Sequence, residues 1–125
     1  MAYYLAGPMR GYPNSNFHTF AEARDHLRSR GHDIICPVEQ AFSQYGDDIQ
    51  ATDENFKEAM RFCYESVLKS EGVVVLPGWN RSEGAKAEVL VALNVGLPVY
   101  AYYRHRPKYL EELNINIITR AEILF

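Results

Sequence analysis

The chain of 125 residues has the composition of an ordinary globular protein, with 47% hydrophobic and 23% charged residues. Its formal net charge of −3 gives no support to a nucleic-acid polymer or an anionic membrane as partner. No apolar run approaches the ~20 residues that span a bilayer, and no basic leader precedes the first predicted strand, so we expect a cytoplasmic protein. The length fits one domain over residues 1–125.

The cysteines and histidines give no sign of a disulfide or a metal site. Cys36 and Cys63 have no CxxC spacing and lie among apolar residues, so we expect both to be reduced. The four histidines lack metal-ligand spacing, and we expect His26 and His32 at the surface.

Short apolar runs alternate with amphipathic segments in the first half of the chain. Residues 2–6 predict a strand that Gly7-Pro8 ends. Residues 16–30 carry apolar side chains at helical spacing and are followed by a glycine. Residues 33–36 predict a second strand. The polar stretch 38–51 is expected to be irregular.

The second half continues the alternation. Thr52 or Asp53 can cap a helix to about residue 69, and the Val-rich run 72–76 is typical of a strand covered on both faces. The remaining predicted elements are a helix from the Ser82 cap to about residue 94, a strand over 98–102, a short helix over 107–113 and an edge strand over 115–118.

This order predicts an α/β fold with a mainly parallel sheet. Ligands of such sheets bind outside the carboxyl ends of the strands, near the point where the strand order reverses. We therefore expect the site where the loops after the first and third strands meet.

The first of these loops is Gly7-Pro8-Met9-Arg10-Gly11. Glycine lets the backbone approach a ligand closely, and free backbone N–H groups can bind anions. Arg10 can bind a phosphate or carboxylate through two hydrogen bonds. The segment matches neither the dinucleotide fingerprint nor the P-loop. A plain tight turn with a solvated arginine is the alternative.

The loop after the third strand holds Trp79, which either stacks on a flat ligand or covers the edge of the sheet. Ser82 and Gly84 open the following helix, where unpaired N–H groups favour an anion. An ordinary helix cap is the alternative role for Ser82, and the two roles are compatible.

Glu88 lies in a helix that is apolar on nearly every side, on one face with Val91, Ala92 and Val95. A carboxyl group there either reaches a sheet-end site or is buried, and a buried one needs a partner. Burial would raise its pKa, as expected of an acid–base or nucleophilic group. The alternative is a glutamate that faces solvent or a subunit interface.

Two motifs together carry a family resemblance. Residues 4–11, Tyr-Leu-Ala-Gly-Pro-Met-Arg-Gly, resemble the opening of the nucleoside 2-deoxyribosyltransferase-like superfamily. Residues 73–79, Val-Val-Val-Leu-Pro-Gly-Trp, and the pattern Ser82-x-Gly84-Ala85-x-x-Glu88 resemble its second hallmark. The superfamily includes nucleoside 5′-monophosphate N-glycosidases and small uncharacterised bacterial and phage proteins. The resemblance covers nearly the whole chain in order.

The resemblance implies a flavodoxin-like or Rossmann-like three-layer sandwich of about five strands, in a homodimer or larger homo-oligomer. It implies cleavage of the N-glycosidic bond of a nucleoside or nucleoside 5′-monophosphate, by hydrolysis or transfer. The glutamate matched by Glu88 attacks the anomeric carbon. Arg10, Gly11 and Ser82, with the backbone of Gly7 and Met9, would hold the phosphate. No metal or cofactor is implied.

One position departs from the family pattern. Counting back from the third strand places Cys63 where the family usually has an aspartate that positions the sugar. Cys63 also falls on the apolar stripe of its helix, which indicates core packing. Cys63 in place of the aspartate favours a nucleotide-binding or sensing module without turnover as an alternative to an enzyme. A structural or host-interaction protein that kept only the fold is a further alternative. Tyr45, Asp47 and Asp48 form either a polar loop or a cover over the base.

Overall fold

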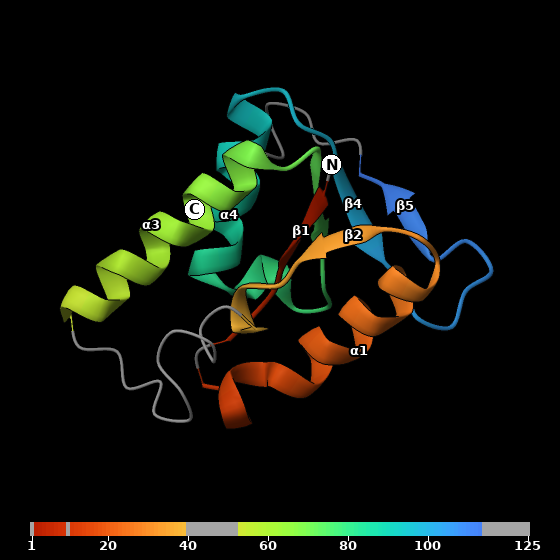
Figure 1. Cartoon of the computed structure of the whole chain (residues 1–125), viewed down its shortest axis with the longest axis horizontal. Helices are drawn as coiled ribbons and strands as arrows, with labels where there is room; N and C mark the ends of the chain where they lie inside the picture. Colours follow the sequence, from red (N-terminus) through yellow and green to blue (C-terminus); the bar gives the residue numbers. More distant parts are fainter. Residues whose placement is uncertain (1, 10, 40–52, 114–125) are drawn as a thin grey trace.

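The computed structural model describes residues 2–9, 11–39 and 53–113 (Figure 1). Most predicted elements are confirmed to within one or two residues at each end. The strands are β1 (Ala2–Ala6), β2 (Asp33–Ile35), β3 (Gly72–Val75), β4 (Val99–Tyr102) and β5 (Leu110–Glu112). The helices are α1 (Phe17–Ser29), α3 (Asp53–Lys69) and α4 (Glu83–Asn94), with short 3-10 turns η1 (Pro13–Asn16) and η2 (Trp79–Arg81).

The five strands form one mostly parallel sheet in the order β2-β1-β3-β4-β5. β1 lies between β2 and β3, with Tyr4 opposite Ile35 on one side and Val73 on the other. β4 adds in parallel beyond β3, whereas β5 is antiparallel. The order reverses at β1, so the carboxyl ends of β1 and β3 flank the position at which such sheets bind ligands.

The prediction of a short helix over residues 107–113 is wrong. Leu110–Glu112 instead form β5, which pairs with β4 from Tyr100↔Glu112 to Tyr102↔Leu110. So short a helix would need tertiary packing to persist, whereas pairing satisfies the backbone groups along the outer side of β4. Leu110 also packs against the core, which an isolated surface helix would not offer.

The prediction of irregular chain from residue 38 is also wrong at its start, because residues 37–39 are helical. The rest of that stretch, with Tyr45, Asp47 and Asp48, lies outside the described residues, as does the strand predicted over 115–118.

α3 and α4 cover one face of the sheet (Figure 1). Strand side chains alternate between faces, and the members of β1 and β3 that point this way are Tyr4, Ala6, Val73 and Val75. They join the small residues of α4 in a buried cluster of Tyr4, Ala6, Val67, Val73, Val75, Ala85, Val89, Ala92, Val99 and Ala101. We call this the α3/α4 core.

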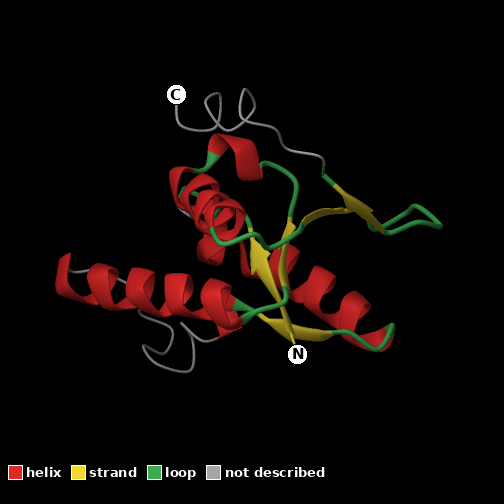
Figure 2. Ribbon diagram, turned by 90° about the horizontal axis from the view of Figure 1, so that it is seen from above, coloured by secondary structure: helices red, strands yellow, loops and turns green. Residues whose placement is uncertain are grey.

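α1 covers the other face, seen on the far side of the sheet from α3 and α4 in Figure 2. Phe20, Ala23 and Leu27 of α1 are buried against Leu5 and Val74. The full α1 core comprises Leu5, Phe20, Ala23, Leu27, Ile34, Cys36, Val38, Val74, Leu76 and Tyr102. Both faces of β1 and β3 are therefore buried, as the unbroken apolar run of β3 predicted.

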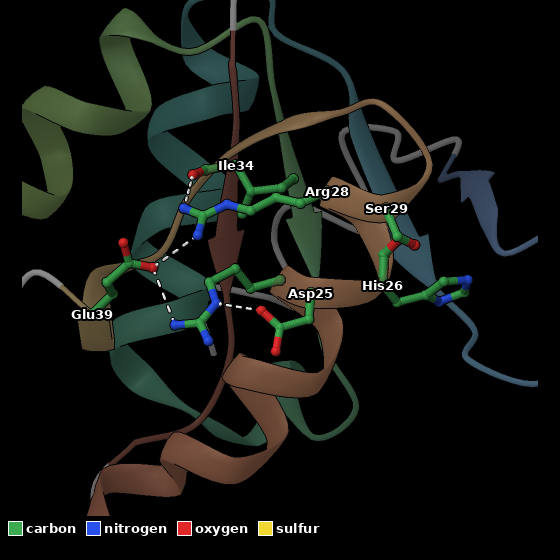
Figure 3. A network of polar contacts seen from close by, with 7 residues as sticks. Asp25, His26, Arg28, Ser29, Ile34 and Glu39 are labelled. Atoms are coloured by element: carbon green, nitrogen blue, oxygen red, sulfur yellow. Dashed lines mark hydrogen bonds and ion pairs between the residues drawn. The ribbon is translucent and has the colours of Figure 1, made fainter.

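Two arginines of α1 contact β2 and the residues that follow it (Figure 3). The guanidinium of Arg28 donates to the carbonyl oxygen of Ile34 at 3.0 Å and pairs with Glu39 at 3.2 Å. Arg24 pairs with the same Glu39 oxygen at 3.1 Å and with Asp25 at 2.9 Å. These contacts fix the chain where it leaves β2 and occupy a carbonyl along that strand.

His26 and His32 correct the expectation of surface histidines. Both are partly buried, with His26 Nδ1 2.7 Å from the Tyr102 hydroxyl and His32 Nε2 3.0 Å from the Tyr109 hydroxyl. They join α1 and the start of β2 to the β4–β5 hairpin, a contact between segments far apart in the sequence.

Both cysteines are free thiols. Among the described helices, none combines the length and apolar character needed to cross a bilayer.

Candidate functional site

The loops that follow β1 and β3 meet, as predicted. Leu76 donates its N–H to the Ala6 carbonyl at 2.8 Å, just where both strands end. A Cβ added to Gly7 would lie 3.0 Å from Leu76 Cβ, so only glycine fits there without movement. On the second loop, a Cβ added to Gly78 would lie 3.3 Å from the Pro8 ring, and the φ of +86° also favours glycine.

The residues of the first loop occupy different environments. Gly7 and Pro8 are buried, and Met9 is partly buried against the α1 core rather than turned to solvent. The Asn16 side-chain amide donates to the Pro8 carbonyl at 2.9 Å and ties the loop to the start of α1. Gly11 is exposed with a φ of +80°, whereas Arg10 lies outside the described residues.

In the second loop, Trp79 is partly buried and packs against the α3/α4 core, which supports its role as a cover for the sheet edge. The Ser82 hydroxyl caps α4 by accepting from the Ala85 N–H at 3.2 Å. A Cβ added to Gly84 would meet nothing within 4 Å, so the first turn of α4 is open beside this glycine.

Glu88 is buried, which excludes the alternative of a solvent-facing glutamate. Only 6% of it is exposed, and its neighbours one turn away along α4, Ala85 and Ala92, belong to the α3/α4 core. The Tyr4 hydroxyl of β1 donates to Glu88 Oε2. The carboxyl group thus contacts β1, the strand whose following loop carries Gly7.

Burial dominates the electrostatics of this pair. It raises the pKa of the Glu88 carboxyl to about 8, although the hydrogen bond from Tyr4 lowers that pKa. Burial and the neighbouring Glu88 hold the pKa of Tyr4 well above its usual value. Tyr4 therefore remains a hydrogen-bond donor across the whole range in which Glu88 titrates.

Cys63 of α3 completes a cluster with these two groups. It packs against the α3/α4 core, as its place on the apolar stripe predicted, and its thiol also interacts with the Tyr4 hydroxyl. Burial, and then the charge of Glu88, raise the pKa of Cys63 to about 11, so the thiol is neutral. The pKa of the next residue, Tyr64, is raised by burial and by interaction with Glu88 and Cys63.

Sequence reasoning singled out Glu88 and missed Tyr4, although Tyr4 stands in the same motif as Gly7. The available signal was a phenol in an otherwise apolar buried strand, since a buried tyrosine hydroxyl usually has a partner. Sequence reasoning also passed over Arg81, whose Nη2 lies 3.6 Å from the point where a Gly78 Cβ would stand.

His18 is not part of the cluster, because it is exposed and pairs with Glu22 at 3.1 Å. Across the described ranges, no three His, Cys, Asp or Glu side chains are arranged to hold a metal ion.

Comparisons with known proteins identify a family for the chain but no individual similar protein. No curated protein and no solved structure matches the chain significantly. A family model does match, over residues 1–101, which include both loops, Tyr4, Cys63 and Glu88. The chain belongs to the family described as a domain of unknown function, DUF4406.

Proposed function

We propose that the protein cleaves the N-glycosidic bond of a nucleoside or nucleoside 5′-monophosphate, with Glu88 as nucleophile. The observation that carries the proposal is a carboxyl group that is buried to all but 6% and accepts a hydrogen bond from the Tyr4 hydroxyl of β1, the strand that leads into the first loop. A buried carboxyl group costs folding free energy, and groups with strongly perturbed pKa values cluster at functional sites.

Two further observations support the proposal. The motifs around Gly7 and Glu88 resemble those of the nucleoside 2-deoxyribosyltransferase-like superfamily. The strand order β2-β1-β3-β4-β5 is the order of flavodoxin-like folds, with helices on both faces, although β5 runs antiparallel here. We accordingly propose a flavodoxin-like three-layer architecture for the chain.

In the proposed reaction, the ionised Glu88 carboxylate attacks the anomeric carbon of the sugar. A bond forms from the carboxylate oxygen to that carbon while the bond to the base nitrogen breaks, and the base leaves with the electron pair and takes a proton from solvent. Water, or an N–H nitrogen of another base, then attacks the same carbon, loses its proton to solvent and releases the Glu88 carboxylate. Tyr4 orients the carboxylate by donating to its second oxygen.

The opening of α4 and the first loop are proposed to hold a 5′-phosphate. Ser82 and the first turn of α4, which is open beside the partly buried Gly84, offer a hydroxyl and backbone N–H groups, and the dipole of α4 favours an anion there. Gly11 and Arg10 would complete the phosphate contacts, and Trp79 would flank the sugar or base.

The test is release of free base, followed by chromatography, from a panel of ribo- and deoxyribonucleosides and their 5′-monophosphates. Glu88→Ala is expected to lose at least about a thousandfold in rate, as for other removed nucleophiles. Glu83→Ala removes an exposed carboxylate from the same helix and is the matched control, expected to retain wild-type activity. Equal rates for wild type and Glu88→Ala would contradict the proposal.

The pH profile provides an independent test of the role of Glu88. Because only the ionised carboxylate is a nucleophile, the rate should rise with pH until it passes the Glu88 pKa of about 8. A rate that falls between pH 6 and pH 9 would instead assign Glu88 the role of a proton donor.

A second candidate function is nucleotide binding without turnover. The neutral Cys63 thiol favours it, because a thiol accepts hydrogen bonds poorly compared with the carboxylate that the superfamily has there. Thermal stabilisation by a nucleotide that stays intact through prolonged incubation would select this alternative.

A further inference from the structure

The β4–β5 hairpin carries the densest group of positive charge in the described part of the chain. Its loop contains Arg104, Arg106 and Lys108 within five consecutive residues, all of them exposed. In Figure 2 this loop extends outward from the body of the protein, away from α3 and α4. The local charge stands out because the whole chain has a formal net charge of −3.

Side-chain contacts hold the two arginines in place. Arg104 pairs with Glu22 of α1, yet 51% of its side chain remains exposed. Arg106 lies over the Tyr103 ring, with its guanidinium carbon 3.8 Å from the ring centroid, and 60% of it is exposed. The only carboxylate that it pairs with among the described residues is Glu111, at the long distance of 3.9 Å.

The base of the hairpin is fixed as well. Tyr103 donates its N–H to the Tyr109 carbonyl at 2.8 Å, and the Tyr109 hydroxyl contacts His32. Arg30, the residue that ends α1 as its C-cap, lies over the Tyr109 ring at 5.5 Å and extends the positive surface toward the helix. A cationic surface that is already ordered loses little conformational entropy on binding an anion.

From this arrangement we infer that the hairpin loop 104–108 is a binding surface for single-stranded nucleic acid. Arg104 and Lys108 supply cations for successive phosphates, and Lys108 has no ion pair within the residues that the structure describes. The Arg106 guanidinium, laid flat on Tyr103, presents its outer face to an unpaired base, since bases stack on arginine planes as they do on aromatic rings.

This partner fits better than a membrane. An interfacial membrane site combines cations with large apolar side chains that insert between lipids. The loop 104–108 offers only Pro107 as an apolar residue. The inference is independent of the proposed reaction at Glu88, which lies on α4.

Fluorescence anisotropy with a labelled twelve-nucleotide oligo-dT measures the binding. Arg106→Gln/Lys108→Gln leaves the Arg104–Glu22 pair intact, and we expect it to weaken binding about tenfold. Because this variant has two fewer cations to neutralise phosphates, the slope of log affinity against log salt should fall by about 1.4. Lys57→Gln/Arg61→Gln removes the same charge from exposed positions of α3 and should bind nearly as wild type does.

A second variant separates base stacking from charge. Arg106→Lys keeps the charge but loses the planar group, so it should weaken binding to oligo-dT severalfold and leave binding to an abasic strand of equal length unchanged. Glu88→Ala should bind both strands as wild type does, which keeps this result separate from the fate of the proposed reaction.

Three outcomes would overturn the inference. They are equal loss in the hairpin and α3 double variants, no binding of either strand by wild type at low salt, and binding only to phosphatidylserine vesicles or to an acidic peptide.

Discussion

The two faces of the sheet differ in how they accommodate polar groups. On the α1 side, the polar side chains pair at the margin of the core, as His26 does with Tyr102 and Arg24 with Glu39. On the α3/α4 side, an ionisable carboxyl group lies inside the core with Tyr4 as its hydrogen-bond donor. The first arrangement stabilises the fold, whereas the second costs stability. A buried ionisable group that lowers the stability of the fold is a stronger indication of function than a stabilising pair at the margin of the core.

The largest effect should follow from a core truncation on the α1 side. Phe20 is fully buried there, so Phe20→Ala should lower the free energy of unfolding by about 3–5 kcal/mol, because it removes apolar packing and leaves a cavity. Urea unfolding at pH 7 measures it. A loss below about 1 kcal/mol would mean that α1 is not packed as described.

Replacing the buried Glu88 carboxyl group should raise the free energy of unfolding at high pH, whereas the Phe20 truncation lowers it. Because the Glu88 pKa is about 8 when folded and near 4.5 in a free carboxyl group, the folded protein binds the extra proton between these values. Wild-type stability should therefore fall as pH rises from about 4.5 to 8, by at most about 1.4 kcal/mol per pH unit.

Glu88→Gln cannot ionise and should lose that part of the slope, becoming more stable than wild type at pH 9. Glu83→Gln, on the exposed side of α4, should keep the wild-type slope. Parallel stability curves for wild type and Glu88→Gln would refute the assignment of a buried acid.

Two phenol-to-phenyl changes compare the faces directly. Tyr4→Phe leaves the Glu88 carboxyl group without its donor and should cost about 1–3 kcal/mol. It should also raise the pKa of Glu88 further, since the Tyr4 hydrogen bond lowers it.

Tyr102→Phe removes a hydrogen bond to the partly buried His26 and should cost about 0.5–1.5 kcal/mol, without effect on base release. Chemical unfolding measures the stability of both variants, and the base-release assay measures their activity. Equal losses of activity would show that the two faces do not divide stability from function.

A comparably small effect is expected at the start of α4. Ser82→Ala removes the helix cap and should cost about 1 kcal/mol. It should also weaken binding of a nucleoside 5′-monophosphate more than binding of the free nucleoside. Ser29→Ala, near the exposed end of α1, is the control and should affect neither ligand. Equal weakening for both ligands would place the phosphate elsewhere.

Much of the fold could be predicted because its signals are local. Periodicity and stop residues located β1, α1, β3 and α4 closely, and Ser82 was correctly predicted as a cap. The hairpin strand β5 was missed because strand or helix in so short a segment depends on what it packs against. The neighbouring β4 edge and the α1 core decided the outcome for Leu110.

The sequence by itself determined that a carboxyl group would lie in an apolar helix, and that a glycine-containing loop would follow each of two buried strands. Only the tertiary structure decided that Tyr4, 84 positions away from Glu88, is its hydrogen-bond donor, and that Cys63 lies beside both. The physical reason is that burial and pairing depend on which elements become neighbours across the sheet. Residue periodicity describes one element at a time and carries no information on its neighbours.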